Sequence, residues 1–445
     1  SVKVNADAVT LASLALSNVE VVQAESTAGA ALTVTAAGQT GMTGVTLVEN
    51  NTTSIDATAE DLAADVGVTI LSNVDAQDAG IHNLGLADAS GTADALTVTL
   101  QGTNGAADNG TDNDIEDIAF TNIETLNLVS SHAGTTALAS TDWNEVADIS
   151  TDTVLTALNV SGSDRIKMTV GSEATNLATL DASAATGDNT YTVSATGNVA
   201  VTTGTGDDTI AMGSTLTNGD TIDGGAHGTA ATDGDMLQAT ITSNTTTTAA
   251  ITVANVEYFE FTNTGTAYVN AAGITGASAD LTVTGASTKT TYSNLGAIHT
   301  VGLGHKDEGG DSNTGITVLG LADATGTSDS VTVNVYDSTS HTLQASGIET
   351  VNVGFSVTDT TISASDLTVS ALNAASIVVS GATADTDSTL TLNTLDTDTT
   401  SLDSTGYKGV LTATGGSATA VTYNLAGTNI NNITASTGND TVTVA

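Results

Sequence analysis

Short runs in which apolar and β-branched residues alternate with polar ones recur along the whole chain and constrain its fold most strongly. The runs span four to six residues and end at Gly, Asn, Asp or Ser, which is typical of half-buried strands separated by turns. Helical periodicity is almost absent, although 58–66 and 141–149 could each hold one or two helical turns. The pattern predicts an all-β protein. Clear runs are Leu32–Thr35, Leu96–Leu100, Leu281–Thr284 and Val331–Val335.

A longer repeat appears when the two halves of the chain are compared. G-L-A-D-A-S-G-T-A-D at 85–94 returns as G-L-A-D-A-T-G-T-S-D at 320–329, and I-E-T-L-N-L at 123–128 returns as I-E-T-V-N-V at 348–353. N-V-E at 18–20 returns at 255–257, and T-G-D-D-T-I at 205–210 returns as T-G-N-D-T-V at 437–442. The four markers keep their order and nearly their spacing, so we predict copies of one unit of about 235 residues. Residues 1–17 would end a preceding β unit, 18–254 form the first copy, and 255–445 form a second, truncated copy.

A shorter recurrence within the unit indicates how its strands are arranged. The form L-x-x-L-(N/D)-x occurs at 155–160 and again at 177–182, and 369–374 repeats the theme in the second copy. One such element per coil would stack the apolar positions of a parallel β-solenoid into a continuous core, which suits a chain with only 3% aromatic residues. A row of small β-sandwiches is the structural alternative, because the strand spacing is less regular than in hexapeptide β-helices.

Composition excludes several classes of function. The chain has 50 acidic and 6 basic side chains, for a formal net charge of −44, so it lacks the clustered Lys and Arg that nucleic acids or anionic membranes require. It has no Cys, which excludes disulfides, thiolate metal sites and cysteine nucleophiles. No run approaches the length of a membrane-spanning helix.

One motif points to a metal. T-G-T-G-D-D-T-I-A at 203–211 fits the calcium-binding nonapeptide G-G-x-G-x-D-x-U-x at every specified position but the first. Glycine lets the backbone turn with positive φ and direct its carbonyls inward, and Asp208 supplies the hard oxygen that Ca²⁺ prefers. Similar turns occur at 219–225, 233–237 and 438–442. Gly-Asp pairs are also ordinary turn formers, but their clustering and recurrence favour Ca²⁺. The candidate ligating residues are Gly204, Gly206, Asp207, Asp208, Asp220, Asp223, Gly225, Asp233, Asp235, Asn439 and Asp440.

Other acidic positions are weaker calcium candidates. Asp94 and Asp329 follow Gly-Thr-x in the duplicated block, and Asp112 and Asp114 belong to an acidic cluster at 108–117. A further cluster lies at 307–311. Their loops lack the nonapeptide spacing, so solvated acidic loops are the alternative interpretation.

Catalytic motifs are lacking in the sequence. The six His residues are dispersed, and neither an H-E-x-x-H zinc motif nor a G-x-S-x-G nucleophile elbow occurs. Ser and Asp are common enough that composition leaves a catalytic triad open, but no spacing favours one. We therefore expect a protein that is not an enzyme.

The order of these blocks resembles the C-terminal region of the S-layer proteins of Caulobacter type. The blocks that carry the resemblance are G-D-D-T-I, G-D-T-I-D-G-G, L-A-D-A-(S/T)-G-T-x-D and I-E-T-(L/V)-N-(L/V). The resemblance implies a secreted, calcium-dependent, RTX-containing β-solenoid exported by type I secretion. It also implies a calcium role for Asp207, Asp208, Asp220, Asp223, Asp235 and Asp440.

These observations together lead to an expectation about function. We expect an extracellular structural protein of the bacterial cell surface that assembles with copies of itself, with Ca²⁺, into an S-layer, sheath or filament. Regions outside this segment could contact cell-surface polysaccharide, and neither nucleic acid nor membrane insertion is expected. The main alternative is a repeat adhesin or biofilm-matrix protein of RTX type. An ice-binding solenoid, suggested by the T-x-T pairs, and an RTX module of a protease or lipase are minor alternatives.

Overall fold

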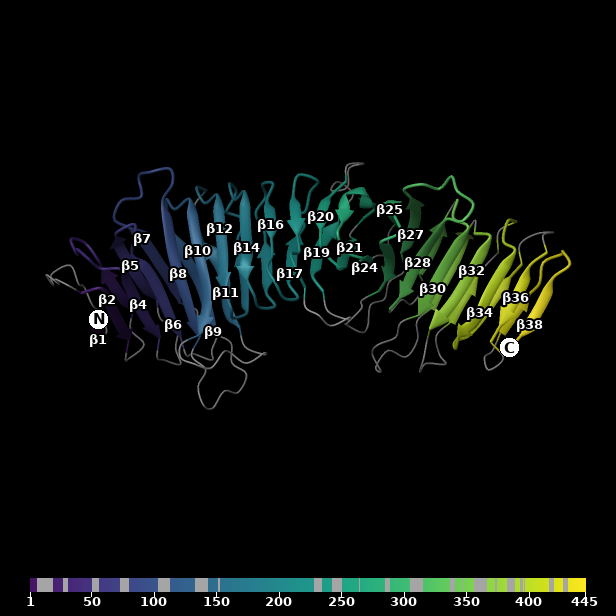
Figure 1. Cartoon of the computed structure of the whole chain (residues 1–445), viewed down its shortest axis with the longest axis horizontal. Coiled ribbons are helices and arrows are strands. Elements are labelled where there is room, and N and C mark those ends of the chain that lie inside the picture. The colour runs from purple at the N-terminus through teal and green to yellow at the C-terminus, as the bar shows by residue number, and fades with distance from the viewer. Residues whose placement is uncertain are drawn as a thin grey trace. The chain divides into compact units, whose positions relative to one another are not determined.

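The structure is a computed structural model, and the residues that it describes form an almost purely β protein (Figure 1). The chain divides into two compact units, unit 1 being residues 1–215 with 219–235 and unit 2 being residues 216–218 with 236–445. The described residues are 1–5, 19–26, 31–49, 56–72, 80–102, 113–132, 143–150, 153–227, 234–241, 250–263, 265–284, 289–304, 315–336, 341–345, 347–355, 366–372, 374–381, 389–392, 395, 397–415, 420–426 and 431–445.

Unit 1 consists of two parallel ladders, and from β2 onward successive strands along the chain alternate between them (Figure 1). The first ladder pairs β1 (Val2–Asn5), β2 (Val21–Ser26), β4 (Gly44–Glu49), β6 (Gly67–Ser72), β8 (Ala95–Gly102), β10 (Thr125–His132), β12 (Ala157–Gly162), β14 (Thr179–Ala185), β16 (Ala200–Thr202) and β18 (Thr221–Asp223). The second pairs β3 (Leu32–Thr35), β5 (Ala57–Leu62), β7 (Ile81–Leu86), β9 (Asn113–Phe120), β11 (Asn144–Ser150), β13 (Ile166–Val170), β15 (Thr190–Val193) and β17 (Thr209–Gly213).

Unit 2 repeats this plan. One ladder pairs β19 (Met236–Ile241), β21 (Tyr258–Asn263), β24 (Ala279–Thr284), β26 (His299–Leu303), β28 (Ser330–Val335), β30 (Thr350–Phe355), β32 (Ser376–Gly381), β34 (Ser401–Tyr407), β36 (Thr422–Leu425) and β38 (Thr441–Val444). Another pairs β22 (Ala267–Asn270), β25 (Lys289–Leu295), β27 (Ile316–Leu321), β29 (His341–Ala345), β31 (Asp366–Leu372), β33 (Thr389–Leu392), β35 (Val410–Thr414) and β37 (Asn431–Thr434). A short pair, β20 (Thr252–Ala254) and β23 (Ile274–Thr275), and the 3-10 helix η2 (Ala271–Gly273) complete it.

The core of each unit is a set of aligned apolar columns. In unit 1 one column runs through Val22, Val45, Val68, Val98, Leu128 and Val160, which are register partners on successive coils and are at most 1% exposed. Each residue in such a column is stacked on the residue above and below it, so a coil buries its apolar face only against its neighbours. This arrangement confirms the predicted parallel β-solenoid, because every strand pair that the structure describes is parallel, unlike the antiparallel pairs of a sandwich.

The predicted coil spacing also holds. Leu158 of β12 is the register partner of Leu180 of β14, and Asn159 is the partner of Asp181. The two stretches considered for helical turns are wrong as helices, because β5 and β11 occupy most of them. Their apolar residues follow the two-residue period of a strand once a bulge in each is allowed for.

Candidate functional site

The predicted calcium turns of unit 1 are stacked on one another. The turn at 203–206, between β16 and β17, lies against the turn at 223–226 of the next coil through a parallel bridge between Thr205 and Ala226. The backbone nitrogen of Gly206 donates to the Ala226 carbonyl at 3.1 Å, and that of Ala226 donates to the Gly204 carbonyl at 2.9 Å. The structure therefore brings together two of the turns that the sequence singled out.

Glycine is required at these turns because backbone carbonyls crowd them. A Cβ on Gly204 would lie 1.9 Å from the carbonyl oxygen of Ala185, and one on Gly225 would lie 2.3 Å from that of Gly204. Gly206 and Gly225 also have positive φ, of 135° and 80°. A lining of close carbonyl oxygens is the kind of donor set that Ca²⁺ accepts.

Asp208 occupies the centre of this region and is fully buried. Its Oδ1 accepts hydrogen bonds from the backbone nitrogen of Asn189 at 2.8 Å and from the Asn189 amide at 3.0 Å. Its Oδ2 accepts from the backbone nitrogen of Gly204 at 3.3 Å. Burial raises the pKa of Asp208 to about 6, even though these hydrogen bonds favour the charged form.

The same capping contact recurs along a column of side chains, each located directly before a strand. The Asn189 Oδ1 accepts from the backbone nitrogen of Ile166 at 3.0 Å, and the Asp235 Oδ1 accepts from that of Asp208 at 2.8 Å. Each side chain thus closes the start of the strand one coil earlier. We call Asn189, Asp208 and Asp235 the capping column. All three are at most 1% exposed.

Two other predicted residues cap strands in the same way. The Asp220 Oδ1 accepts from the backbone nitrogen of Val199 at 2.8 Å, and the Asp440 Oδ1 accepts from that of Val421 at 2.9 Å. The hydrogen bond from Val421 lowers the pKa of Asp440, assisted by one from Ser436. Asp223 accepts from the backbone nitrogen of Gly225 at 3.0 Å and so closes its own turn.

A buried tyrosine accompanies the capping aspartate in both units. Tyr191 of unit 1 and Tyr423 of unit 2 are fully buried, and the hydroxyl of neither has a hydrogen-bond partner in the part of the chain that the structure describes. Burial, with the nearby Asp208 charge, raises the pKa of Tyr191, and burial with Asp440 does the same for Tyr423. An orphaned buried hydroxyl beside a carboxylate is an oxygen that is still available to a bound cation.

The remaining predicted positions lie apart from this cluster. The backbone nitrogen of Asp207 donates to Asp188, and Asn439 lies on the turn before β38. Asp233 and Asp112 lie outside the described residues, as does the side chain of Asp114 in β9. The weaker clusters at 108–112 and 307–311 lie outside them too. Among the residues described, no group of three or more His, Asp or Glu side chains is placed to hold a metal by side chains alone.

The duplicated block has a structural role in both units. The Asp94 Oδ2 accepts from the backbone nitrogen of Gly91 at 3.0 Å, and Glu124 on the next coil accepts from that of Asp94 at 2.8 Å. In unit 2, Asp329 accepts from Gly326 at 3.1 Å and Glu349 accepts from Asp329 at 2.9 Å. The two sequence blocks recur together because they contact each other. The contact is kept although the chain between the two blocks is shorter in unit 2.

Asn189 was missed by the sequence motifs. It ends the segment T-G-D-N at 186–189, which has nearly the same letters as T-G-D-D at 205–208 and fills the equivalent place on the coil before. A search for T-G-D followed by Asn or Asp, instead of the full nonapeptide, would have found this coil.

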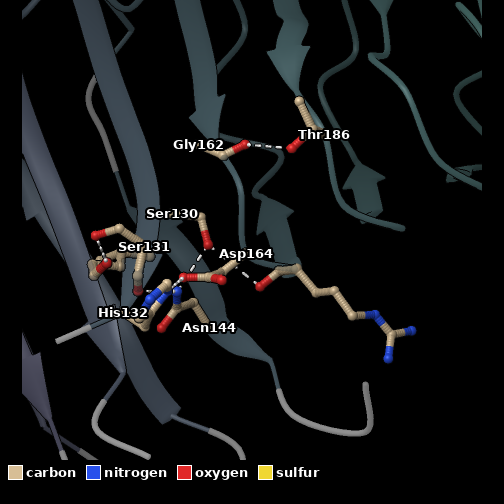
Figure 2. Close-up of polar contacts among 9 residues, drawn as sticks. Ser130, Ser131, His132, Asn144, Gly162, Asp164 and Thr186 are labelled. Atoms are coloured by element: carbon tan, nitrogen blue, oxygen red, sulfur yellow. Dashed lines mark hydrogen bonds and ion pairs between the residues drawn. The ribbon is translucent and has the colours of Figure 1, made fainter. Parts of the chain in front are cut away.

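A second polar cluster was also not predicted, and Figure 2 shows it at the end of β10. The His132 Nδ1 lies 2.8 Å from the Asp164 Oδ2, and Asn144 donates to Ser130 at 2.8 Å and to the Ser131 carbonyl at 3.0 Å. The Ser130 hydroxyl donates to the Arg165 carbonyl at 3.3 Å, and the Ser131 hydroxyl to the Leu100 carbonyl at 3.2 Å. Both hydroxyls are thus engaged by backbone, so the cluster fastens a corner of the coil and does not have the form of a catalytic triad.

Comparison with known proteins adds no identity. No protein-family model matches the chain, and no curated protein sequence matches it. Within the described residues, no helix has the length and apolar character needed to cross a membrane.

Proposed function

We propose that the chain is a structural, non-enzymatic protein of the bacterial cell exterior that assembles with copies of itself into an S-layer, sheath or filament. The observation that carries the proposal is structural repetition. The same turn, closed by Asp94 and Glu124 in unit 1 and by Asp329 and Glu349 in unit 2, recurs in a stack of coils. A fold of this kind provides long regular surfaces, which suit many identical weak contacts better than one specialised reaction.

Calcium is the second part of the proposal. Asp208 and Asp235, together with the carbonyl oxygens of Ala185 and Gly204, would hold the ion and give it hard oxygen ligands. Bound Ca²⁺ would supply positive charge to buried carboxylates in a chain of net charge −44. An ion that binds only the folded chain stabilises it by mass action, so folding would follow the calcium concentration.

Secretion before folding is consistent with the composition. A chain with no Pro and no Cys has neither slow X–Pro isomerisation nor thiols to misoxidise. Acidic repulsion would keep it open where calcium is scarce, as in a type I export route, and extracellular calcium would then allow it to fold.

The second candidate function is a repeat adhesin or biofilm-matrix protein of RTX type. It is favoured by the uninterrupted parallel ladders within each unit, which would also serve as a stiff stalk. In that function the chain would bind calcium and fold but remain monomeric.

Electron microscopy of purified chain in EDTA, in Ca²⁺ and in Mg²⁺ separates these functions. We expect ordered sheets, tubes or filaments in Ca²⁺, with dispersed particles in EDTA and in Mg²⁺ at equal ionic strength. Folded monomers in Ca²⁺ at every protein concentration would overturn the assembly function and favour the stalk.

A further inference from the structure

A hollow lies on the outer face of the second ladder of unit 1, where β5, β7, β9 and β11 are successive neighbours. Its volume is about 420 Å³, which is within the usual range of ligand pockets, about 300–1,000 Å³. None of the capping or turn residues described above lines it. The hollow is therefore a separate feature of the coil stack.

The ladder register explains why the surface is hollowed here. Asn83 of β7, Ala119 of β9 and Ser150 of β11 are register partners and form one outward row. Gly85 follows Asn83 by two residues on the same face, and a Cβ on it would meet no atom within 4 Å. Gly85 and Ala119 thus form a low floor between the longer side chains around them.

The walls of the hollow are polar. They carry three hydroxyls, one amide and one carboxylate, which together can accept and donate several hydrogen bonds. The carboxylate is on an exposed position of β5, beside the floor. These side chains are Thr58, Thr121, Ser150, Asn83 and Glu60.

The charge around the hollow restricts what it could bind. The Thr35 hydroxyl donates to the Glu60 Oε1 at 2.9 Å and so holds that carboxylate in place. On the opposite side, the Ser150 nitrogen donates to the Asp117 Oδ1 at 3.1 Å and its hydroxyl to the Asp148 Oδ2 at 3.2 Å. None of the residues that line the hollow is basic. Such surroundings repel anions and suit a neutral ligand whose hydroxyls donate to carboxylate and amide oxygens.

Unit 2 repeats the local backbone of this region. The bulge in β5 and the bulge in β25 each contain one residue with positive φ, Asp61 at 56° and Asn294 at 58°. The floor glycine is also kept, as Gly85 of β7 and Gly320 of β27. The bulge is therefore part of the coil design in both units.

The side chains of the hollow, in contrast, differ between the units. When the strands are aligned on their bulges, unit 2 lacks both the carboxylate and the amide of the walls and has a long side chain in place of the floor alanine. The replacements are Ser293 for Glu60, Val318 for Asn83 and Gln344 for Ala119. The combination of a low floor and polar walls is thus specific to unit 1 and is not required by the coil.

We propose that this hollow is a binding site for a neutral carbohydrate. Glu60 and Asn83 would bind sugar hydroxyls, and the floor at Gly85 and Ala119 would receive the CH face of the ring. The hollow is shallow and carries a single charged wall, so we expect about millimolar affinity for one sugar unit. This inference goes beyond the assembly function and depends neither on assembly nor on calcium ligation.

Saturation-transfer difference NMR of the full chain in Ca²⁺, with glucose, galactose, mannose and N-acetylglucosamine as probes, tests the site. We expect saturation transfer to at least one of the four sugars. Ala119→Gln raises the floor with the side chain that unit 2 has at the equivalent position, and it should abolish the transfer. Glu60→Gln keeps the shape but loses a charge-assisted hydrogen bond, so it should weaken binding about tenfold. Ala147→Gln makes the floor substitution at an exposed position of β11 outside the hollow and should bind as wild type.

Circular dichroism of each variant separates loss of binding from loss of folding. Absence of transfer to all four sugars in the wild-type chain would overturn the proposal, as would unchanged transfer in both Ala119→Gln and Glu60→Gln. Stronger binding of glucuronate or of spermidine than of every neutral sugar would also overturn it, because the occupant would then be an anion or a cation. A chain that binds a sugar but does not assemble in Ca²⁺ would support this site and contradict only the assembly function.

Discussion

Asp208→Asn is expected to change stability in opposite directions with and without calcium. In EDTA at pH 7 the buried Asp208 carboxylate is ionised at a cost, because burial raises its pKa from 3.8 to about 6. A difference of about 2 in pKa corresponds to about 3 kcal/mol. The substitution removes that cost. It also turns an amide NH₂ toward the backbone nitrogen of Gly204, which in the wild-type chain donates to Oδ2 at 3.3 Å, and the loss of this hydrogen bond costs about 1 kcal/mol.

The net expectation in EDTA at pH 7 is a gain of about 2 kcal/mol, or roughly 4–8 °C in the unfolding temperature of a unit of this size. Since the folded chain holds the Asp208 proton more tightly than the unfolded chain does, the contribution of this group is complete below pH 3.8 and is lost as the pH rises through 6. The advantage of the variant should therefore vanish at pH 4. In Ca²⁺ at pH 7 the variant lacks a charged ligand and should melt below wild type.

Differential scanning calorimetry in EDTA and in Ca²⁺, at pH 4 and pH 7, measures all four conditions. Asp181→Asn is the matched control, because it removes a charge at an exposed position of β14 where the Asn oxygen can still accept from Ser183. A variant that is less stable than wild type in EDTA at pH 7 would refute the argument that Asp208 is held ionised at a cost. An equal effect in both media would refute its calcium role.

Three further predictions concern the stack itself. Gly204→Ala places a methyl group 1.9 Å from the Ala185 carbonyl and should cost at least about 2 kcal/mol in urea unfolding, whereas Gly85→Ala, with open space around it, should cost little. Glu124→Ala and Glu349→Ala each leave one backbone nitrogen without its acceptor, so each should lose about 1–2 kcal/mol by thermal unfolding, and a clear inequality would contradict the equivalence of the two units. Burial lowers the pKa of His299, whose Nδ1 accepts from the Gly296 nitrogen at 2.8 Å. The neutral imidazole therefore contributes stability above pH 6.5 that is lost as the pH falls through the lowered pKa. The substitution His299→Gln should flatten the acid limb of a curve of unfolding free energy against pH.

The fold was predictable because the alternation of apolar and polar residues recurs in the sequence with each coil. The spacing of Leu158 and Leu180 matches the ladder register, and the alternation at Leu96–Leu100 matches the buried and outward faces of β8. The stretches that became β5 and β11 were harder to interpret, because a bulge in each shifts the apolar period toward that of a helix.

The candidate site was predictable only in part. The turns at 203–206 and 223–226 carry a glycine pattern that local sequence reveals. The capping column depends on register between coils that differ in length, 19 residues from Asn189 to Asp208 and 27 from Asp208 to Asp235, so a fixed motif does not find it. The pairing of Asp94 with Glu124 was likewise hidden, although the duplicated blocks had marked both residues as special.

The most direct test of the account is a calcium titration of the EDTA-stripped chain in which far-ultraviolet circular dichroism and light scattering are recorded on the same samples. The account predicts that the far-ultraviolet β signal rises as calcium is added and that scattering rises with it, as folded units associate. Full β-structure in EDTA, with neither signal responding to calcium, would contradict the account.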